Sequence, residues 1–185
     1  MLKAADEAGR LAPLLPVREF VANRKRTVAY VLSPDGKRLL WTQTVGLDSG
    51  LAVRDIGPPG KPANPPRTYA VGNRGRGGGL TTWLQDSRHI VFSRDPNGNE
   101  NVQIWVQDAE SSSFEPWAVA PSPRARHRYR GRSASSPTSF YFLSNERDRS
   151  TFDLYEADAA TQMVREVARS DGSTLSWIIG HDRKL

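Results

Sequence analysis

The chain has 185 residues, with 26 Lys and Arg against 20 Asp and Glu, and it contains no Cys. Without Cys it can form neither a disulfide nor a thiolate nucleophile nor a Cys-based zinc site. No apolar run reaches the roughly 18 residues that a transmembrane helix needs, so we expect no membrane association. The first 26 residues are charged and lack a continuous apolar stretch. No secretory signal is therefore visible, which leaves the compartment open, with the cytoplasm favoured.

The net charge of +6 is concentrated in two short segments. Residues 1–26 carry six basic and three acidic groups, and residues 124–132 carry five Arg and no acid. The rest of the chain is close to neutral. Nucleic-acid-binding domains more often spread a basic face over the whole fold, so this distribution argues against a nucleic-acid partner.

An internal repeat of about 50 residues runs through the chain. The stretch Ser33–Trp41 matches Leu84–Phe92, and a more divergent third copy lies at Pro137–Phe142. A second motif that ends in Asp follows each copy, at Leu51–Asp55, Ile104–Asp108 and Leu154–Asp158. Repeats of this length are typical of solenoids and propellers.

Each repeat follows the same order of elements. A short β-rich run leads into a turn made of Pro, Asp, Gly or Ser, residues that favour tight turns. A second run, a polar loop, a third run and a fourth run follow. In the first repeat, the expected second, third and fourth strands are Leu39–Thr44, Leu51–Asp55 and Arg67–Val71. In the second repeat they are His89–Arg94, Asn101–Asp108 and Phe114–Val119, and in the third they are Phe140–Ser144, Phe152–Asp158 and Met163–Ala168.

Four short strands per repeat of about 50 residues is the pattern of a propeller blade. We therefore predict an all-β partial β-propeller of about three four-stranded blades, at residues 27–72, 79–120 and 128–169, with the start of a fourth at 173–185. Residues 1–26 are predicted to form a separate helical or extended segment. Propellers have about four to eight blades, so we expect the chain to be part of a longer protein. An open ring leaves sheet faces and strand edges uncovered, which favours self-association.

An ordered set of motifs resembles the N-terminal propeller of the prolyl oligopeptidase family of serine peptidases. The closest branch is that of bacterial dipeptidyl- and acylaminoacyl-peptidase-like members, and the resemblance covers roughly residues 14–185. The motifs that carry it are Leu15–Phe20 with Asn23, Leu32–Lys37, Trp83–Ile90 with Asp95–Asn101, Asn145–Asp148 with Phe152–Tyr155, and Trp177 with His181–Leu185.

The resemblance implies a role in cleaving short peptides. In the family, a C-terminal α/β-hydrolase domain carries the Ser-Asp-His triad, and the propeller caps and gates the active site. The present chain contains no Gly-x-Ser-x-Gly elbow, and its nearest string, Gly46–Gly50, has the wrong spacing. No catalytic residue can be assigned, and the chain alone is predicted to be inactive. The alternative is a non-enzymatic TolB-like propeller that binds protein partners, since TolB-like propellers share the Ser-Pro-Asp-Gly-Lys signature.

Six residues are candidates for substrate or interdomain contacts. Arg126, Arg128 and Arg130 alternate along a segment that, if extended, would point them to one side. Such a row can bind phosphates or a carboxylate, or face acidic residues of the next repeat. The other three candidates are the loop residues Asn99 and Glu100, expected at the face nearest the catalytic domain, and Arg147 of the third repeat.

We predict no metal ion and no cofactor. The loop Asp95–Asn101 spaces oxygen side chains as a calcium loop does, but Glu100 stands where an EF-hand needs Gly. Turns closed by Asp and Asn side chains are the favoured interpretation of this loop. The three His residues, including His127, lack partners at ligand spacing and are expected to be polar strand or loop residues.

Overall fold

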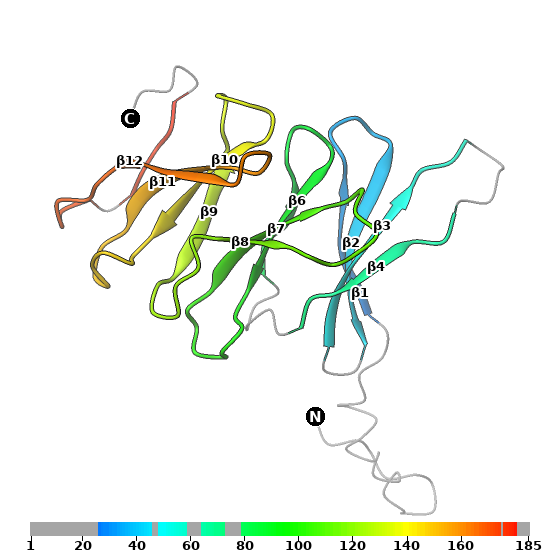
Figure 1. Cartoon of the computed structure of the whole chain (residues 1–185), viewed down its shortest axis with the longest axis horizontal. Helices are drawn as coiled ribbons and strands as arrows, with labels where there is room; N and C mark the ends of the chain where they lie inside the picture. The colour runs from blue at the N-terminus through cyan, green and yellow to red at the C-terminus, as the bar shows by residue number, and fades with distance from the viewer. Residues whose placement is uncertain (1–25, 46–47, 59–63, 73–78, 175, 181–185) are drawn as a thin grey trace, which may run out of the picture.

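The computed structural model describes residues 26–45, 48–58, 64–72, 79–174 and 176–180. Nearly all of the predicted N-terminal segment and the pair His181–Asp182 lie outside these residues. The described chain forms three four-stranded antiparallel sheets that lie side by side (Figure 1). It contains no helix that could span a membrane. The prediction of an all-β chain made of three four-stranded repeats is confirmed.

Each sheet is a meander in which consecutive strands pair. The first sheet contains β1 Arg26–Leu32, β2 Arg38–Val45, β3 Asp48–Asp55 and β4 Arg67–Ala70. The second contains β5 Thr81–Trp83, β6 His89–Arg94, β7 Gln103–Asp108 and β8 Trp117–Val119. The third contains β9 His127–Arg132, β10 Ser139–Ser144, β11 Asp153–Asp158 and β12 Met163–Ala168.

The sequence repeat corresponds to a repeated strand register. In every sheet, the Asp that ends the third strand lies opposite the first residue of the second strand, in the pairs Arg38–Asp55, His89–Asp108 and Ser139–Asp158. The turn before the second strand is also the same, because a side-chain oxygen accepts the backbone N–H two residues later. This oxygen comes from Asp35, Asp86 and, in the divergent third copy, Ser136.

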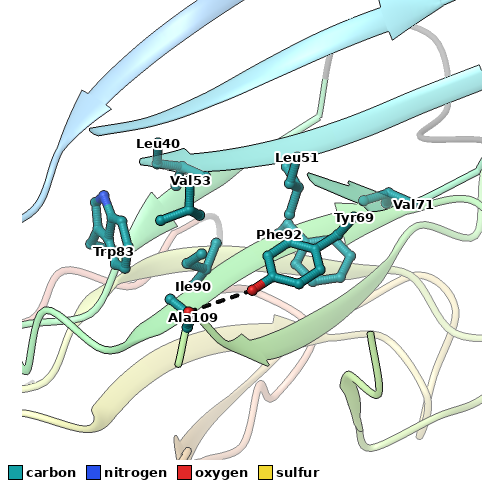
Figure 2. Close-up of a cluster of buried hydrophobic side chains, with 9 residues drawn as sticks. All are labelled: Leu40, Leu51, Val53, Tyr69, Val71, Trp83, Ile90, Phe92 and Ala109. Atoms are coloured by element: carbon teal, nitrogen blue, oxygen red, sulfur yellow. Dashed lines mark hydrogen bonds between the residues drawn. The ribbon is translucent and has the colours of Figure 1, made fainter. Parts of the chain in front are cut away.

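The first and second sheets pack face to face around one apolar cluster. Figure 2 shows Leu40, Leu51 and Tyr69 of the first sheet directed toward Phe92 and Ile90 of the second. The Tyr69 hydroxyl donates a hydrogen bond across the interface to the carbonyl oxygen of Ala109, at 3.4 Å. Trp83, also in this cluster, is fully buried and donates from Nε1 to the Val31 carbonyl oxygen at 3.2 Å.

The third sheet is apolar on both faces. All six residues of β10 are buried, and alternate side chains of a strand point to opposite faces. Phe140 and Phe142 belong to the cluster shared with the second sheet, whereas Tyr141 belongs to a further cluster on the outer face. Trp177 and Ile179 pack against that outer cluster, where the start of a fourth blade is expected.

Removal of the Trp83 side chain should destabilise the chain strongly. Trp83→Ala leaves a hole in a fully buried cluster and removes the bond to Val31, so we expect a loss of about 3–5 kcal/mol in the free energy of unfolding. Ile178→Ala, at a side chain that is 82% exposed, should cost less than about 0.5 kcal/mol. Urea unfolding followed by circular dichroism measures both variants. Equal effects would contradict the packing of the first two sheets.

Candidate functional site

Three connections meet at one end of the sheets. They are the β6–β7 loop (95–102), the β8–β9 linker (120–126) and the β10–β11 loop (145–152). In an antiparallel meander, every second connection returns to the same end of the sheet. We call this end the loop face. Four of the six candidate residues, Asn99, Glu100, Arg126 and Arg147, lie in these connections.

Hydrogen bonds tie the three connections together. The Asn101 side chain donates to the Pro123 carbonyl oxygen at 3.1 Å. The side-chain amide of buried Gln103 donates to the Ala125 carbonyl oxygen at 2.6 Å. The Arg126 backbone N–H then donates to Oδ1 of Asn145, also at 2.6 Å. The loop face is therefore a continuous surface across the second and third sheets.

Asn99 and Glu100 are presented by a loop that folds around one buried carboxylate. Asp95 is only 3% exposed. It accepts backbone N–H groups of Asn99 at 3.2 Å and of Glu100 at 3.0 Å. Glu100 has a positive φ of 66°, a conformation that is strained for a non-glycine residue. Asp95 holds the backbone of both residues, and the side chains of Asn99 and Glu100 are exposed.

The arginine row follows β9 along the edge of the third sheet. Arg126 precedes the strand and is half-buried. The Arg128 guanidinium lies 4.2 Å from the centre of the Phe152 ring, a cation–π geometry. Arg130 donates to the Ser176 hydroxyl at 3.1 Å and to the Trp177 carbonyl oxygen at 2.8 Å. Arg128 and Arg130 thus contact the loop residue Phe152 and the segment 176–180, respectively.

A β-bulge interrupts the alternation of this row. The pairing of β10 with β9 shifts between Tyr141 and Phe142, next to Gly131, whose φ is 141°. Gly adopts such a backbone at no steric cost. Arg130 is the extra, unpaired residue of the bulge. As a result, Arg132 points toward the second sheet, where it donates to the Trp83 carbonyl oxygen at 3.1 Å. The sequence pattern did not reveal this bulge.

Arg147 holds the β10–β11 loop in place. Its guanidinium contacts both carboxylate oxygens of Asp153, at 2.7 and 2.8 Å, and the Ser170 carbonyl oxygen at 2.8 Å. Asp153 is almost completely buried. The Arg147 guanidinium therefore holds the pKa of that carboxyl below its usual range. This bidentate pair links the loop to the chain that leaves β12.

The burial of several polar side chains was not predicted from the sequence, and the first of two examples is Glu156. It stands where the other repeats have Val53 and Val106. Burial would raise its pKa, but the hydroxyl groups of Ser133 and Ser135 and the Arg165 guanidinium keep it below its usual value. Glu156 borders a cavity of about 240 Å³ on the outer face of the third sheet. Aligning the three repeats position by position would have revealed this Val-to-Glu change.

The second is His127, whose side chain is only 2% exposed. Its ring lies 5.4 Å from that of Phe142, and its backbone N–H bonds to the Val102 carbonyl oxygen at the interface of the second and third sheets. Neither ring nitrogen has a hydrogen-bond partner in the described part of the chain. Burial lowers the pKa of His127 from 6.5 to about 4.

Comparison with known proteins identifies the fold. No family model matches the chain, and no curated protein matches its sequence. TolB from Acinetobacter baumannii matches in structure with a TM-score of 0.52 and 14% identity, over 77% of this chain and 32% of TolB. The β-propeller domain of the Trilobed protease from Pyrococcus furiosus matches with a TM-score of 0.51 and 14% identity, over 77% and 43% of the two chains. The chain is a partial β-propeller.

A Pyrococcus horikoshii acylaminoacyl peptidase also matches, with a TM-score of 0.51 and 15% identity, over 79% of this chain and 25% of the peptidase. The chain therefore spans less than half the length of each of these three proteins. At identities this low, the structural matches establish the propeller fold alone. The resemblance to the prolyl oligopeptidase family stays a prediction.

The burial of His127 predicts that the propeller loses stability in mild acid. The unfolded imidazole takes up a proton near pH 6.5, whereas the folded one resists protonation down to about pH 4. Above pH 6.5 the neutral imidazole is present in both states and does not lower the free energy of unfolding. As the pH falls from 6.5 toward 4, protonation of the unfolded chain lowers the free energy of unfolding progressively. Between pH 7 and pH 5, we expect the free energy of unfolding to fall by about 2 kcal/mol more than in His127→Phe. Urea unfolding at both pH values tests this, and equal losses in both proteins would contradict it.

Proposed function

We propose that the chain is the substrate-gating propeller portion of a prolyl-oligopeptidase-like serine peptidase that acts on short peptides. One observation carries the proposal. Two of the motifs that carry the family resemblance, 95–101 and 145–155, form loops of the loop face, and each is held by a buried carboxylate, Asp95 or Asp153. A surface whose loops are held in one conformation by buried carboxylates is suited to dock a second domain or to orient a substrate.

The proposed roles of the six residues follow from their surroundings. Asn99 and Glu100 are exposed and are available to contact a peptide or a catalytic domain. Arg126 is available in the same way, since its guanidinium forms no ion pair among the described residues. Arginine binds carboxylates through two parallel hydrogen bonds. Arg147 acts by positioning its loop, Arg128 packs on Phe152 of the same loop, and Arg130 supports the segment 176–180.

Catalysis is assigned to a separate α/β-hydrolase domain. The 185 residues contain no Gly-x-Ser-x-Gly sequence, the elbow that presents the serine nucleophile in α/β-hydrolases. In this proposal the propeller excludes large folded proteins and holds short peptides, while the nucleophile, acid and base come from the other domain.

A TolB-like module that binds protein partners is the second candidate. TolB from Acinetobacter baumannii matches this chain as well as the peptidase propellers do. In such a module the loop face would bind a partner protein, and no hydrolase domain would be attached.

The coding sequence distinguishes the two candidates. If the peptidase proposal is right, the reading frame continues past the codon for Leu185 through further blade repeats into a Gly-x-Ser-x-Gly elbow, followed by Asp and His. Sequencing the genomic DNA downstream of this codon is the measurement. A frame that completes a ring and stops, with no hydrolase sequence, would reject the peptidase proposal in favour of the TolB-like module.

We further propose that the chain self-associates when it is produced alone. Its uncovered faces carry large apolar side chains that reach solvent, among them Tyr30, Leu32, Met163 and Ile178. Uncovered sheet faces and edge strands such as β4 and β12 promote pairing between chains. Sedimentation velocity at several concentrations should show oligomers that increase with concentration. A single monomer boundary at every concentration would contradict this expectation.

A further inference from the structure

A second cavity lies between the edge strand β9 and the segment 176–180. Its volume is about 210 Å³. It is lined by Arg130, Gly131, Arg132, Ala134, Tyr141, Trp177, Ile179 and Gly180. One wall is therefore cationic and the other is built of aromatic and aliphatic side chains. Polar and apolar surface line the cavity in similar amounts, so a ligand that fits it needs both a polar and an apolar group.

Within the part of the chain that the structure describes, both arginines of the cavity bond to neutral acceptors. Arg130 donates to a hydroxyl and a carbonyl oxygen of the segment 176–180. Arg132 donates to a carbonyl oxygen and, at 3.0 Å, to the side-chain oxygen of Gln85. Neither guanidinium forms an ion pair within the described residues. Arg88 and Arg147, in contrast, each pair with a carboxylate.

The local sequence supplies no acid to neutralise these charges. The segment 124–132 contains five Arg and neither Asp nor Glu. The bulge at Gly131 directs Arg130 toward the segment 176–180 and Arg132 toward the second sheet, while both still line the same cavity. No Cβ occupies the space at Gly131, where an added one would meet no atom within 4 Å. Among the residues that the structure describes, neither of these two positive charges has a negative partner.

We propose that this cavity binds the carboxylate of a small ligand or of a peptide C-terminus. The planar fork of a guanidinium matches the two oxygens of a carboxylate. The apolar wall formed by Tyr141, Trp177 and Ile179 would receive the group next to the carboxylate. The proposal is independent of the peptidase assignment, because either kind of propeller can hold an anion at this place.

The test uses an N-acetylated leucine dipeptide with a free C-terminal carboxylate and the matching C-terminal amide. Isothermal titration of the full chain should show the carboxylate form binding at least about tenfold more tightly than the amide. Arg130→Gln and Arg132→Gln should each weaken binding of the carboxylate form about tenfold. Arg54→Gln, which removes the same charge from an exposed position of β3 in the first sheet, should change it less than about twofold.

Four results would overturn the proposal. The first is equal affinity for the carboxylate and the amide. The second is an equal effect of Arg54→Gln, which would mean that only the overall charge matters. The third is tighter binding of inorganic phosphate than of the dipeptide through the same arginines, which would reject the carboxylate as the ligand group. Arg132→Lys keeps the charge but loses the fork, so a folded Arg132→Lys protein with unchanged affinity would also count against the proposal.

Discussion

A four-stranded sheet whose two faces are both apolar must be covered on both sides, and among the described residues the cover comes from a neighbouring sheet or from the segment 176–180. The third sheet makes the constraint plain. Phe142 on one face packs against the second sheet, and Tyr141 on the other requires Trp177 and the segment around it. Burial of apolar surface is the main favourable contribution to folding. The stacking of sheets therefore determines which residues lie inside, and the loop face forms where the second and third sheets meet.

Both candidate sites depend on this stacking. The loop face becomes continuous because Asn101 and Asn145 bond across connections that the stacked sheets bring together. In the cavity beside β9, Arg130 bonds to the segment beyond the third sheet, while Arg132 bonds back to the second. A residue at the contact of two sheets, such as His127, then links the stability of the stack to pH.

Sequence reasoning predicted the features that repeat. The three sheets, their strands and the turns at Asp35 and Asp86 follow from local patterns that recur every 50 residues or so. The exceptions escaped prediction because they depend on partners far along the chain. The bulge at Gly131 is defined by pairing with another strand, Glu156 is satisfied by hydroxyl groups more than 20 residues away, and the burial of His127 results from contact between two sheets. Without those partners, each of these residues looks like an ordinary strand or loop residue.

Amide hydrogen exchange, resolved strand by strand, tests the stacking most directly. The second sheet is the only one of the three described sheets with another sheet on both sides, so its central strands β6 and β7 should exchange most slowly. The edge strands β4 and β12 should exchange fastest. Comparable protection of all three sheets, or slower exchange in β12 than in β7, would contradict the claim that each sheet depends on its neighbours for stability.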